Sequence, residues 1–186
     1  MPSVQIGDKW LLGRHVVYCE DTSSNKFINF LPSEVALAII TPSSSWNHDY
    51  SIDKARIVAV VLEEDRIYNF CTRQQMPFRF ELLLGDFYIA VFSHQLIPKP
   101  RKPTEIEGIE GIVAFLVARY TSFGNSVFAS FMGNGEILMT CEKMGRICIA
   151  GDKNPRTVSR ALNRWQNWTN KQAQKLDNYC PLENNE

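Results

Sequence analysis

The stretch that decides the predicted fold is Glu136-Ile-Leu-Met-Thr-Cys-Glu-Lys-Met-Gly-Arg-Ile-Cys-Ile-Ala-Gly-Asp-Lys-Asn-Pro155. It holds two short apolar runs, Ile137 to Cys141 and Arg146 to Ala150. Runs of this length bounded by glycine favour strands. A third run, Ser126 to Phe131, precedes them, and Gly133-Asn134-Gly135 supplies the positive φ angles of a tight turn. The sequence therefore predicts a three-stranded antiparallel meander.

A long helix follows the meander. Asn154 is a good N-cap, and Pro155 suits the first helical position because it lacks an N–H. The apolar residues after them recur at helical spacing: Val158, Ala161, Leu162, Trp165 and Trp168.

A second helix is predicted before the meander, from Glu105 to about Tyr120. Thr104 and Glu107 have the spacing of a capping box. The segment Pro98-Lys-Pro-Arg-Lys-Pro103 favours extended polyproline geometry and predicts a basic linker. These boundaries divide the chain into a β-rich subdomain (1–97), the linker (98–103), a helix–meander–helix subdomain (104–176) and a flexible tail (177–186); a single domain throughout is the alternative.

The first half is rich in predicted strands. Short strands at 10–12 and 15–18 flank Gly13, and two hairpins follow. Val35 to Ile40 reads as a short helix after Pro32, with a buried strand as the alternative that periodicity alone does not resolve. The hairpins are 56–62 with 66–70, and 78–84 with 87–92. The predicted fold class is α+β, with antiparallel sheets, a mid-chain helix, the meander and a long C-terminal helix.

Composition indicates an ordinary globular protein. The 186 residues are 45% hydrophobic and 22% charged, with a formal net charge of zero. Charge is distributed unevenly: residues 1–70 hold nine acids and six bases, whereas residues 153–175 hold six bases and no acid. No apolar run is long enough for a membrane span and no secretory signal is recognised at Met1 to Gly13, so the five cysteines are predicted to be reduced and the protein intracellular, in nucleus or cytoplasm.

Residues that could carry catalysis do not form a recognisable motif. The three histidines, His15, His48 and His94, lack metal-ligand spacing to one another or to cysteine. His48-Asp49 lies in a serine-rich loop without the nucleophile elbow of a hydrolase. The sequence therefore predicts a non-enzymatic protein with no catalytic residue, metal or cofactor. A small enzyme is the alternative only if His48, Asp49 and a cysteine converge in space.

The basic face of the last helix is the predicted binding site. Arg156, Arg160 and Arg164 recur at i, i+4 spacing, and Lys171 and Lys175 add charge toward the end. Such a row suits an acidic partner, either nucleic acid or an acidic protein surface, and would make binding salt-dependent. A solvated helix face is the alternative. Trp168, between Asn167 and Thr169, is the predicted interface aromatic, whereas Trp165 is predicted to be core.

Residues 86–175 resemble one half-repeat of the TATA-box-binding protein family. The matching segments are Ile106-Glu-Gly-Ile109 or the similar Ile109-Glu-Gly-Ile112, and Gly145-Arg-Ile-Cys-Ile-Ala-Gly-Asp-Lys153. The resemblance implies a strand, helix, curved meander and long helix. The family kinks DNA with phenylalanine wedges on its sheet; here Asn125 and Glu142 stand at those positions, with Phe123 nearby. A glutamate facing DNA would repel it, which leaves the outer face of the last helix.

These observations predict a non-enzymatic, transcription-related binding protein that engages an acidic partner through its C-terminal helix. The alternative is a structural or viral-accessory protein that self-associates without binding nucleic acid. A homo-oligomer is compatible with either.

Overall fold

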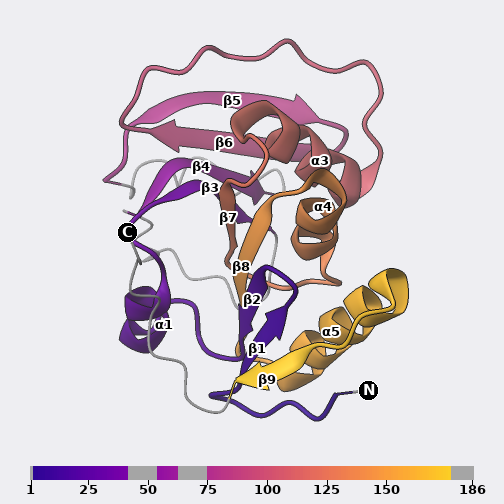
Figure 1. The fold of residues 1–186 in the computed structure, drawn as a ribbon. Helices are drawn as coiled ribbons and strands as arrows, with labels where there is room; N and C mark the ends of the chain where they lie inside the picture. The colour runs from indigo at the N-terminus through magenta and orange to yellow at the C-terminus, as the bar shows by residue number, and fades with distance from the viewer. Residues whose placement is uncertain (1, 42–53, 63–74, 177–186) are drawn as a thin grey trace.

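One mixed β-sheet organises the computed structural model, which describes residues 2–41, 54–62 and 75–176 (Figure 1). Within these residues the sheet has nine strands in the order β5-β6-β4-β3-β7-β8-β2-β1-β9. Their bounds are β1 Lys9–Leu12, β2 His15–Tyr18, β3 Val35–Ile40, β4 Ala55–Leu62, β5 Phe78–Leu84, β6 Phe87–Ser93, β7 Ser126–Ala129, β8 Ile147–Gly151 and β9 Gln174–Leu176.

The centre of the sheet is parallel, which corrects the predicted antiparallel α+β class. Strands β4, β3, β7, β8 and β2 pair in parallel along the row, while β6, β5, β1 and β9 add antiparallel edges. Parallel strands are buried on both faces and so read as continuous apolar runs, such as the fully buried Val35–Ile40. The protein is an α/β fold.

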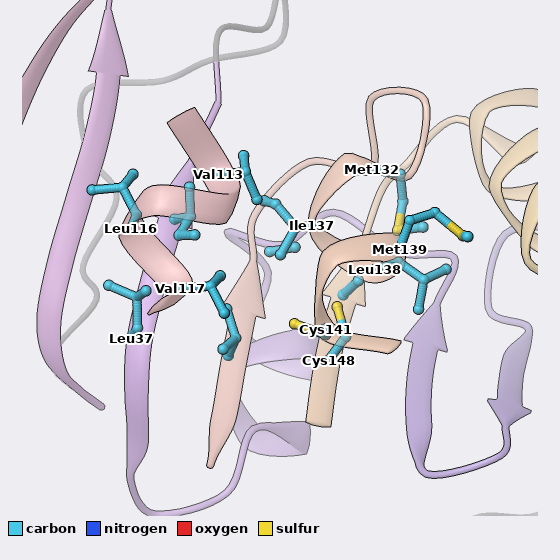
Figure 2. Packing of buried hydrophobic residues seen from close by; sticks show 14 of the residues in the cluster. Leu37, Val113, Leu116, Val117, Met132, Ile137, Leu138, Met139, Cys141 and Cys148 are labelled. Carbon is cyan, nitrogen blue, oxygen red and sulfur yellow. The ribbon is translucent and has the colours of Figure 1, made fainter. Parts of the chain in front are cut away.

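Helices cover both faces of this sheet. Their bounds are α1 Asn25–Phe30, α3 Gly108–Tyr120, α4 Glu136–Met144 and α5 Pro155–Thr169. The larger core lies between the sheet and α3, α4 and α5; Figure 2 shows Leu116 and Val117 of α3 packed near Leu37 of β3. The smaller core contains Phe27 of α1 against the other face. No helix in the described ranges is long and apolar enough to cross a bilayer.

The prediction that Ile137 to Cys141 form the central strand of a meander was wrong, because Glu136–Met144 is helix α4. Gly135 and Gly145 bound it in the left-handed conformation, and the Gly145 N–H donates to the carbonyls of Cys141 and Glu142. Leu, Met, Glu and Lys are strong helix formers, so this short segment had the composition of a helix. Glu142 therefore lies on a helix and not on a DNA-facing sheet.

Two further predictions about local structure were wrong. The short helix predicted over Val35–Ile40 is strand β3, the alternative that the apolar run left open. Helix α3 begins at Gly108 with Glu107 as its N-cap and no side-chain capping bond, so Thr104 forms no capping box.

Several other predictions are confirmed. The β1–β2 and β5–β6 hairpins form where expected. Asn154 caps α5 by accepting a hydrogen bond from the Arg156 N–H, and Pro155 is its first residue. Strand β4 forms over the first arm of the 56–70 hairpin, but it pairs with β3 and β6. The second arm and the serine-rich loop with His48 lie outside the described residues, and the subdomain division at 98–103 stays a prediction.

The strand order reverses direction between β3 and β7. From β3 the chain continues to β4 on one side, and from β7 it continues through α4 to β8 on the other. The unit β7–α4–β8 is a parallel strand–helix–strand crossover. In open α/β sheets, ligands bind outside the carboxyl ends of the strands at such a switch point.

Candidate functional site

A glycine-containing loop follows β7 at the switch point. Gly133 and Gly135 adopt positive φ angles of 52° and 84°, and Gly135 is the N-cap of α4. The positive φ of Gly133 disfavours any side chain there, and a Cβ atom would also lie 2.6 Å from Oε2 of Glu136, whose side chain would have to move. A tight glycine loop that opens a helix lets a ligand approach the backbone closely.

The carboxylate of Glu136 lies over this loop. Its Oε2 accepts a hydrogen bond from the backbone N–H of Asn134 at 2.9 Å. Glu136 is the first residue of α4, where the partial positive charge of the helix favours an anion. The loop therefore already carries a negative group where phosphate-binding helices receive a phosphate.

Asp152 follows the adjacent strand β8 at the same edge. Its two carboxylate oxygens accept hydrogen bonds from the backbone N–H groups of Asn154 at 2.8 Å and Met132 at 3.3 Å. Asp152 thus connects the end of β8 to the glycine loop. It lies 17 residues after Gly135, close to the spacing of about 20 residues at which nucleotide-binding crossovers place the acid that holds a ribose hydroxyl.

The remaining space at this edge is small and polar. A cavity of about 10 Å³ is lined by Asp21, Thr22, Phe131, Asp152 and Lys153. The hydroxyl of Thr22 donates to the carbonyl of Ser130, and the buried Ser130 Oγ has no hydrogen-bond partner in the described part of the chain. The cavity admits about one water, so a larger ligand requires its lining side chains to move apart.

Arg164 of α5 holds the glycine loop from outside. Its guanidinium donates to the carbonyl of Asn134 at 2.9 Å and to Oε1 of Glu110 at 2.5 Å. The hydrogen bond from Arg164 lowers the pKa of Glu110 below its ordinary value. One predicted site residue therefore lies at this edge of the molecule, engaged with α3 and the loop.

The other predicted site residues lie apart from the loop. Arg156 and Arg160 are exposed on α5, and Lys175 in β9 pairs with Asp8 at 2.8 Å. Lys171 lines a second cavity, beside Glu142. Trp168 is 52% exposed, whereas Trp165 is fully buried, as predicted. Binding of a partner by the five basic residues and Trp168 stays a prediction.

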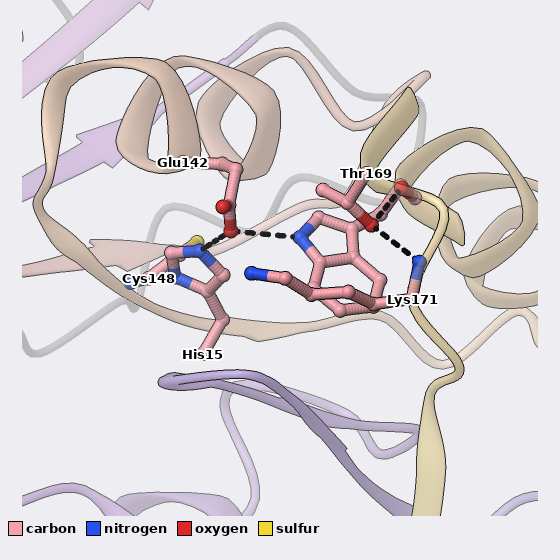
Figure 3. Close-up of polar contacts among 6 residues, drawn as sticks. His15, Glu142, Cys148, Thr169 and Lys171 are labelled. Carbon is pink, nitrogen blue, oxygen red and sulfur yellow. Dashed lines mark hydrogen bonds and ion pairs between the residues drawn. The ribbon is translucent and has the colours of Figure 1, made fainter. Parts of the chain in front are cut away.

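A partly buried hydrogen-bond network lies beneath α5 (Figure 3). His15 Nδ1 accepts from the Cys148 N–H at 2.9 Å, so Nε2 carries the proton and donates to Oε2 of Glu142 at 2.7 Å. The same carboxylate oxygen accepts from Trp165 Nε1 at 2.9 Å. Burial lowers the pKa of His15, against the effect of Glu142. Burial raises the pKa of Glu142, but the hydrogen bonds from Trp165 and His15 outweigh it, and that pKa falls below its ordinary value.

This network predicts that the protein loses stability in mild acid. The pKa of His15 is lowered on folding, so the unfolded chain binds a proton more readily, and the free energy of unfolding falls as pH drops below the ordinary value of 6.5. Glu142, whose pKa is also lowered, adds a further loss below 4.5. Urea unfolding between about pH 5 and 7.5 measures how steeply the free energy of unfolding depends on pH. His15→Asn should make this dependence weaker. His94→Asn, at an exposed histidine, is the control and should leave it unchanged. An equal pH dependence in the parent protein and both variants would refute the assignment to His15.

Comparisons with known proteins identify the fold. The cytosine-N4-specific PvuII DNA methyltransferase is 12% identical, with 84% of this chain and 89% of that chain covered at a TM-score of 0.62. M1.HpyAVI in its complex with SAM is 14% identical, with coverages of 80% and 97% and a TM-score of 0.61. TTHA0409 from Thermus thermophilus, provisionally assigned as a DNA modification methylase and complexed with S-adenosyl-L-methionine, is 13% identical, with coverages of 81% and 94% and a TM-score of 0.60.

No protein-family model matches the sequence, and no curated protein matches it. At these identities the structural similarity shows a shared fold. It corrects the resemblance to the TATA-box-binding protein, because the solved structures that share this fold are named as DNA methyltransferases. The prediction of a non-enzymatic binding protein is contradicted as well, since the solved structures that share this fold are named as DNA methyltransferases.

Sequence reasoning missed the loop because it assigned Gly133-Asn134-Gly135 to a hairpin turn. The available signal was the combination of a strand, two glycines, a helix-forming segment and an acid after the next strand. Asp152 entered the sequence analysis only as part of the segment that resembles the TATA-box-binding protein family, and Glu136 was assigned no role.

Proposed function

We propose that this protein is an S-adenosyl-L-methionine-dependent methyltransferase that acts on DNA. The observation that carries the proposal is the crossover β7–α4–β8, with its glycine loop at the switch point and Asp152 after the second strand. The likeness to methyltransferases solved with this cofactor supports the same assignment.

The charge on the loop favours this cofactor over a dinucleotide. A dinucleotide places its pyrophosphate at the helix N-terminus after the glycine loop. Here the Glu136 carboxylate occupies that position and would repel a phosphate. S-adenosyl-L-methionine has an adenosine ribose but no phosphate, and it carries positive charge on its sulfur and amino group, which suits a carboxylate.

The side chains at the edge fit such a group. Asp152 would accept hydrogen bonds from the ribose hydroxyls, and the Gly133–Gly135 backbone would permit close approach. The buried Ser130 Oγ, which has no partner in the described residues, offers a further polar contact. The bound cofactor supplies an electrophilic methyl group on a positively charged sulfur. The chain's own contribution is to orient the adenosine portion, through a loop fixed by Asp152 and Arg164.

DNA is the proposed methyl acceptor because it is the substrate named for the PvuII enzyme. DNA as substrate agrees with the intracellular location predicted from the cysteines, and nucleus versus cytoplasm stays open. The test is transfer of a tritiated methyl group from S-adenosyl-L-methionine to duplex DNA of mixed sequence. We expect the parent protein to label the DNA. Equal labelling by Asp152→Asn would count against the assigned site, and no label with any DNA would overturn the function.

Arg164→Ala should weaken cofactor binding while scarcely changing stability. Its bond to the Asn134 carbonyl fixes the loop, and loss of one hydrogen bond of about 1 kcal/mol corresponds to roughly fivefold in affinity. The ion pair between Arg164 and Glu110 is exposed, so its loss should change the free energy of unfolding by less than about 1 kcal/mol. Calorimetric titration with S-adenosyl-L-methionine measures the effect, with Arg160→Ala, one turn earlier on the same helix, as the control. Equal affinities in both variants would contradict this role.

A further inference from the structure

A second cavity lies at the edge of the sheet opposite the glycine loop. Its volume is about 80 Å³, and it is lined by Gly13, Arg14, His15, Glu142, Arg146 and Lys171. The parallel strands β2 and β8 begin here, at His15 and Ile147. Since a water needs about 10–15 Å³ by this measure, the cavity holds several waters or one small polyatomic ion.

Arg146 is fixed at one side of this cavity. Its Nε donates to Thr121 Oγ1 at 3.0 Å, one terminal nitrogen donates to the Met144 carbonyl at 2.6 Å, and the other donates to the Thr121 carbonyl at 2.9 Å. A guanidinium has five N–H donors, so two are left over after these bonds. Arg146 is therefore a pre-oriented cation that retains hydrogen-bonding capacity.

Arg14 and Lys171 supply two more positive charges. The Arg14 guanidinium carbon lies 5.4 Å from the centre of the Phe123 ring, within cation–π range. Asn170, in the left-handed conformation, ends α5 and directs the chain to Lys171. Figure 3 shows the Lys171 side chain extending toward His15 and Glu142. Neither cation forms an ion pair with a carboxylate within the described ranges.

The negative charge of Glu142 only partly offsets these cations. Its Oε2 is already hydrogen-bonded to His15 and Trp165. His15 adds no positive charge, because its Nδ1 accepts from the Cys148 N–H and burial lowers its pKa. Three cations thus surround the cavity with one carboxylate, which leaves a net charge of +2.

We propose that this cavity binds a phosphate group. Two arginines and a lysine around a space of this size match the charge and the donor geometry that tetrahedral oxyanions require. The phosphate is either free inorganic phosphate or a phosphate of the nucleic-acid backbone; both present the same oxygens to Arg14, Arg146 and Lys171. The site is independent of the proposed cofactor site, which lies at the other edge of the sheet.

The test is calorimetric titration of the full chain with inorganic phosphate at constant ionic strength. We expect a dissociation constant of about 1 mM, the range of a weak anion site. Arg14→Ala and Lys171→Ala should each raise it about tenfold, by loss of one charge-assisted hydrogen bond. Lys26→Ala removes an equal charge from an exposed position on α1 and should leave the dissociation constant unchanged. Glu142→Gln removes the opposing charge but keeps an oxygen acceptor, and should lower it.

Two results would overturn the proposal. One is an absence of phosphate binding by the parent protein; the other is a loss of affinity in Lys26→Ala as large as in Lys171→Ala, which would indicate general charge attraction. A short duplex DNA distinguishes the two sources of phosphate. Competition between DNA and phosphate that disappears in Lys171→Ala assigns the site to the nucleic-acid backbone, and phosphate binding without competition assigns it to free phosphate.

Discussion

Asp152→Asn is expected to weaken the binding of S-adenosyl-L-methionine by roughly 10- to 100-fold. A hydrogen bond from a ribose hydroxyl to a charged carboxylate contributes about 1.5–3 kcal/mol, and a neutral amide supports less of it. The asparagine retains one oxygen, so the bond from the Asn154 N–H at 2.8 Å can persist, whereas the bond from the Met132 N–H of the glycine loop at 3.3 Å is lost and contributes to the change. Calorimetric titration with the cofactor measures the change.

Asp86→Asn is the matched control. Asp86 is an exposed aspartate between β5 and β6, on strands far along the sheet from β8. It should bind the cofactor like the parent protein. If Asp152→Asn also binds like the parent, Asp152 does not hold the ribose and the proposed site is wrong.

Trp165→Ala is expected to lower the free energy of unfolding by about 3–5 kcal/mol. Trp165 is fully buried between α5 and the rest of the larger core. Truncation of a buried tryptophan leaves a cavity, and this lowers the free energy of unfolding by about 3–5 kcal/mol. It also removes the N–H that donates to Glu142. Urea unfolding followed by circular dichroism measures the loss.

Trp168→Ala separates burial from residue type. Trp168 lies on the same helix, three residues later, and is 52% exposed. Its removal should cost less than about 1 kcal/mol. Similar losses for both tryptophans would contradict the packing of α5. Trp165→Phe should have an intermediate effect, because it keeps most of the side-chain volume but removes the N–H that donates to Glu142. We expect it to lower the free energy of unfolding by about 1–3 kcal/mol.

The sequence predicted those elements whose signals are local. Asn154 and Pro155 identified the start of α5, and apolar spacing placed Trp165 in the core. The β5–β6 hairpin was predicted from two strands joined by Gly85-Asp86. Each of these depends on contacts between residues near in sequence or on one helix face.

What the sequence did not predict depends on pairing between distant segments. Strand β3 pairs with β7, about 90 residues later in the chain. The apolar pattern of either strand does not indicate which other strand it pairs with. Reading α4 as a strand removed the crossover and turned a parallel sheet into an antiparallel meander. The candidate site was lost with it, because Asp152 reaches Met132 at the glycine loop only when β7 and β8 are parallel neighbours.

Arg164 illustrates the same limit at a single residue. Its i, i+4 spacing with Arg156 and Arg160 predicted one basic face. In the folded protein it bonds to the Asn134 carbonyl and Glu110, which are 30 and 54 residues away in sequence. Only the tertiary arrangement distinguishes it from the two exposed arginines.

The central claim is that the glycine loop binds a nucleoside cofactor without phosphates. Calorimetric titration of the full chain with S-adenosyl-L-methionine and, separately, with NAD tests it most directly. We predict binding of S-adenosyl-L-methionine with a dissociation constant of about 1–100 μM, and no measurable binding of NAD, because the Glu136 carboxylate occupies the phosphate position. Failure to bind S-adenosyl-L-methionine, or binding of NAD with equal affinity, would contradict the account.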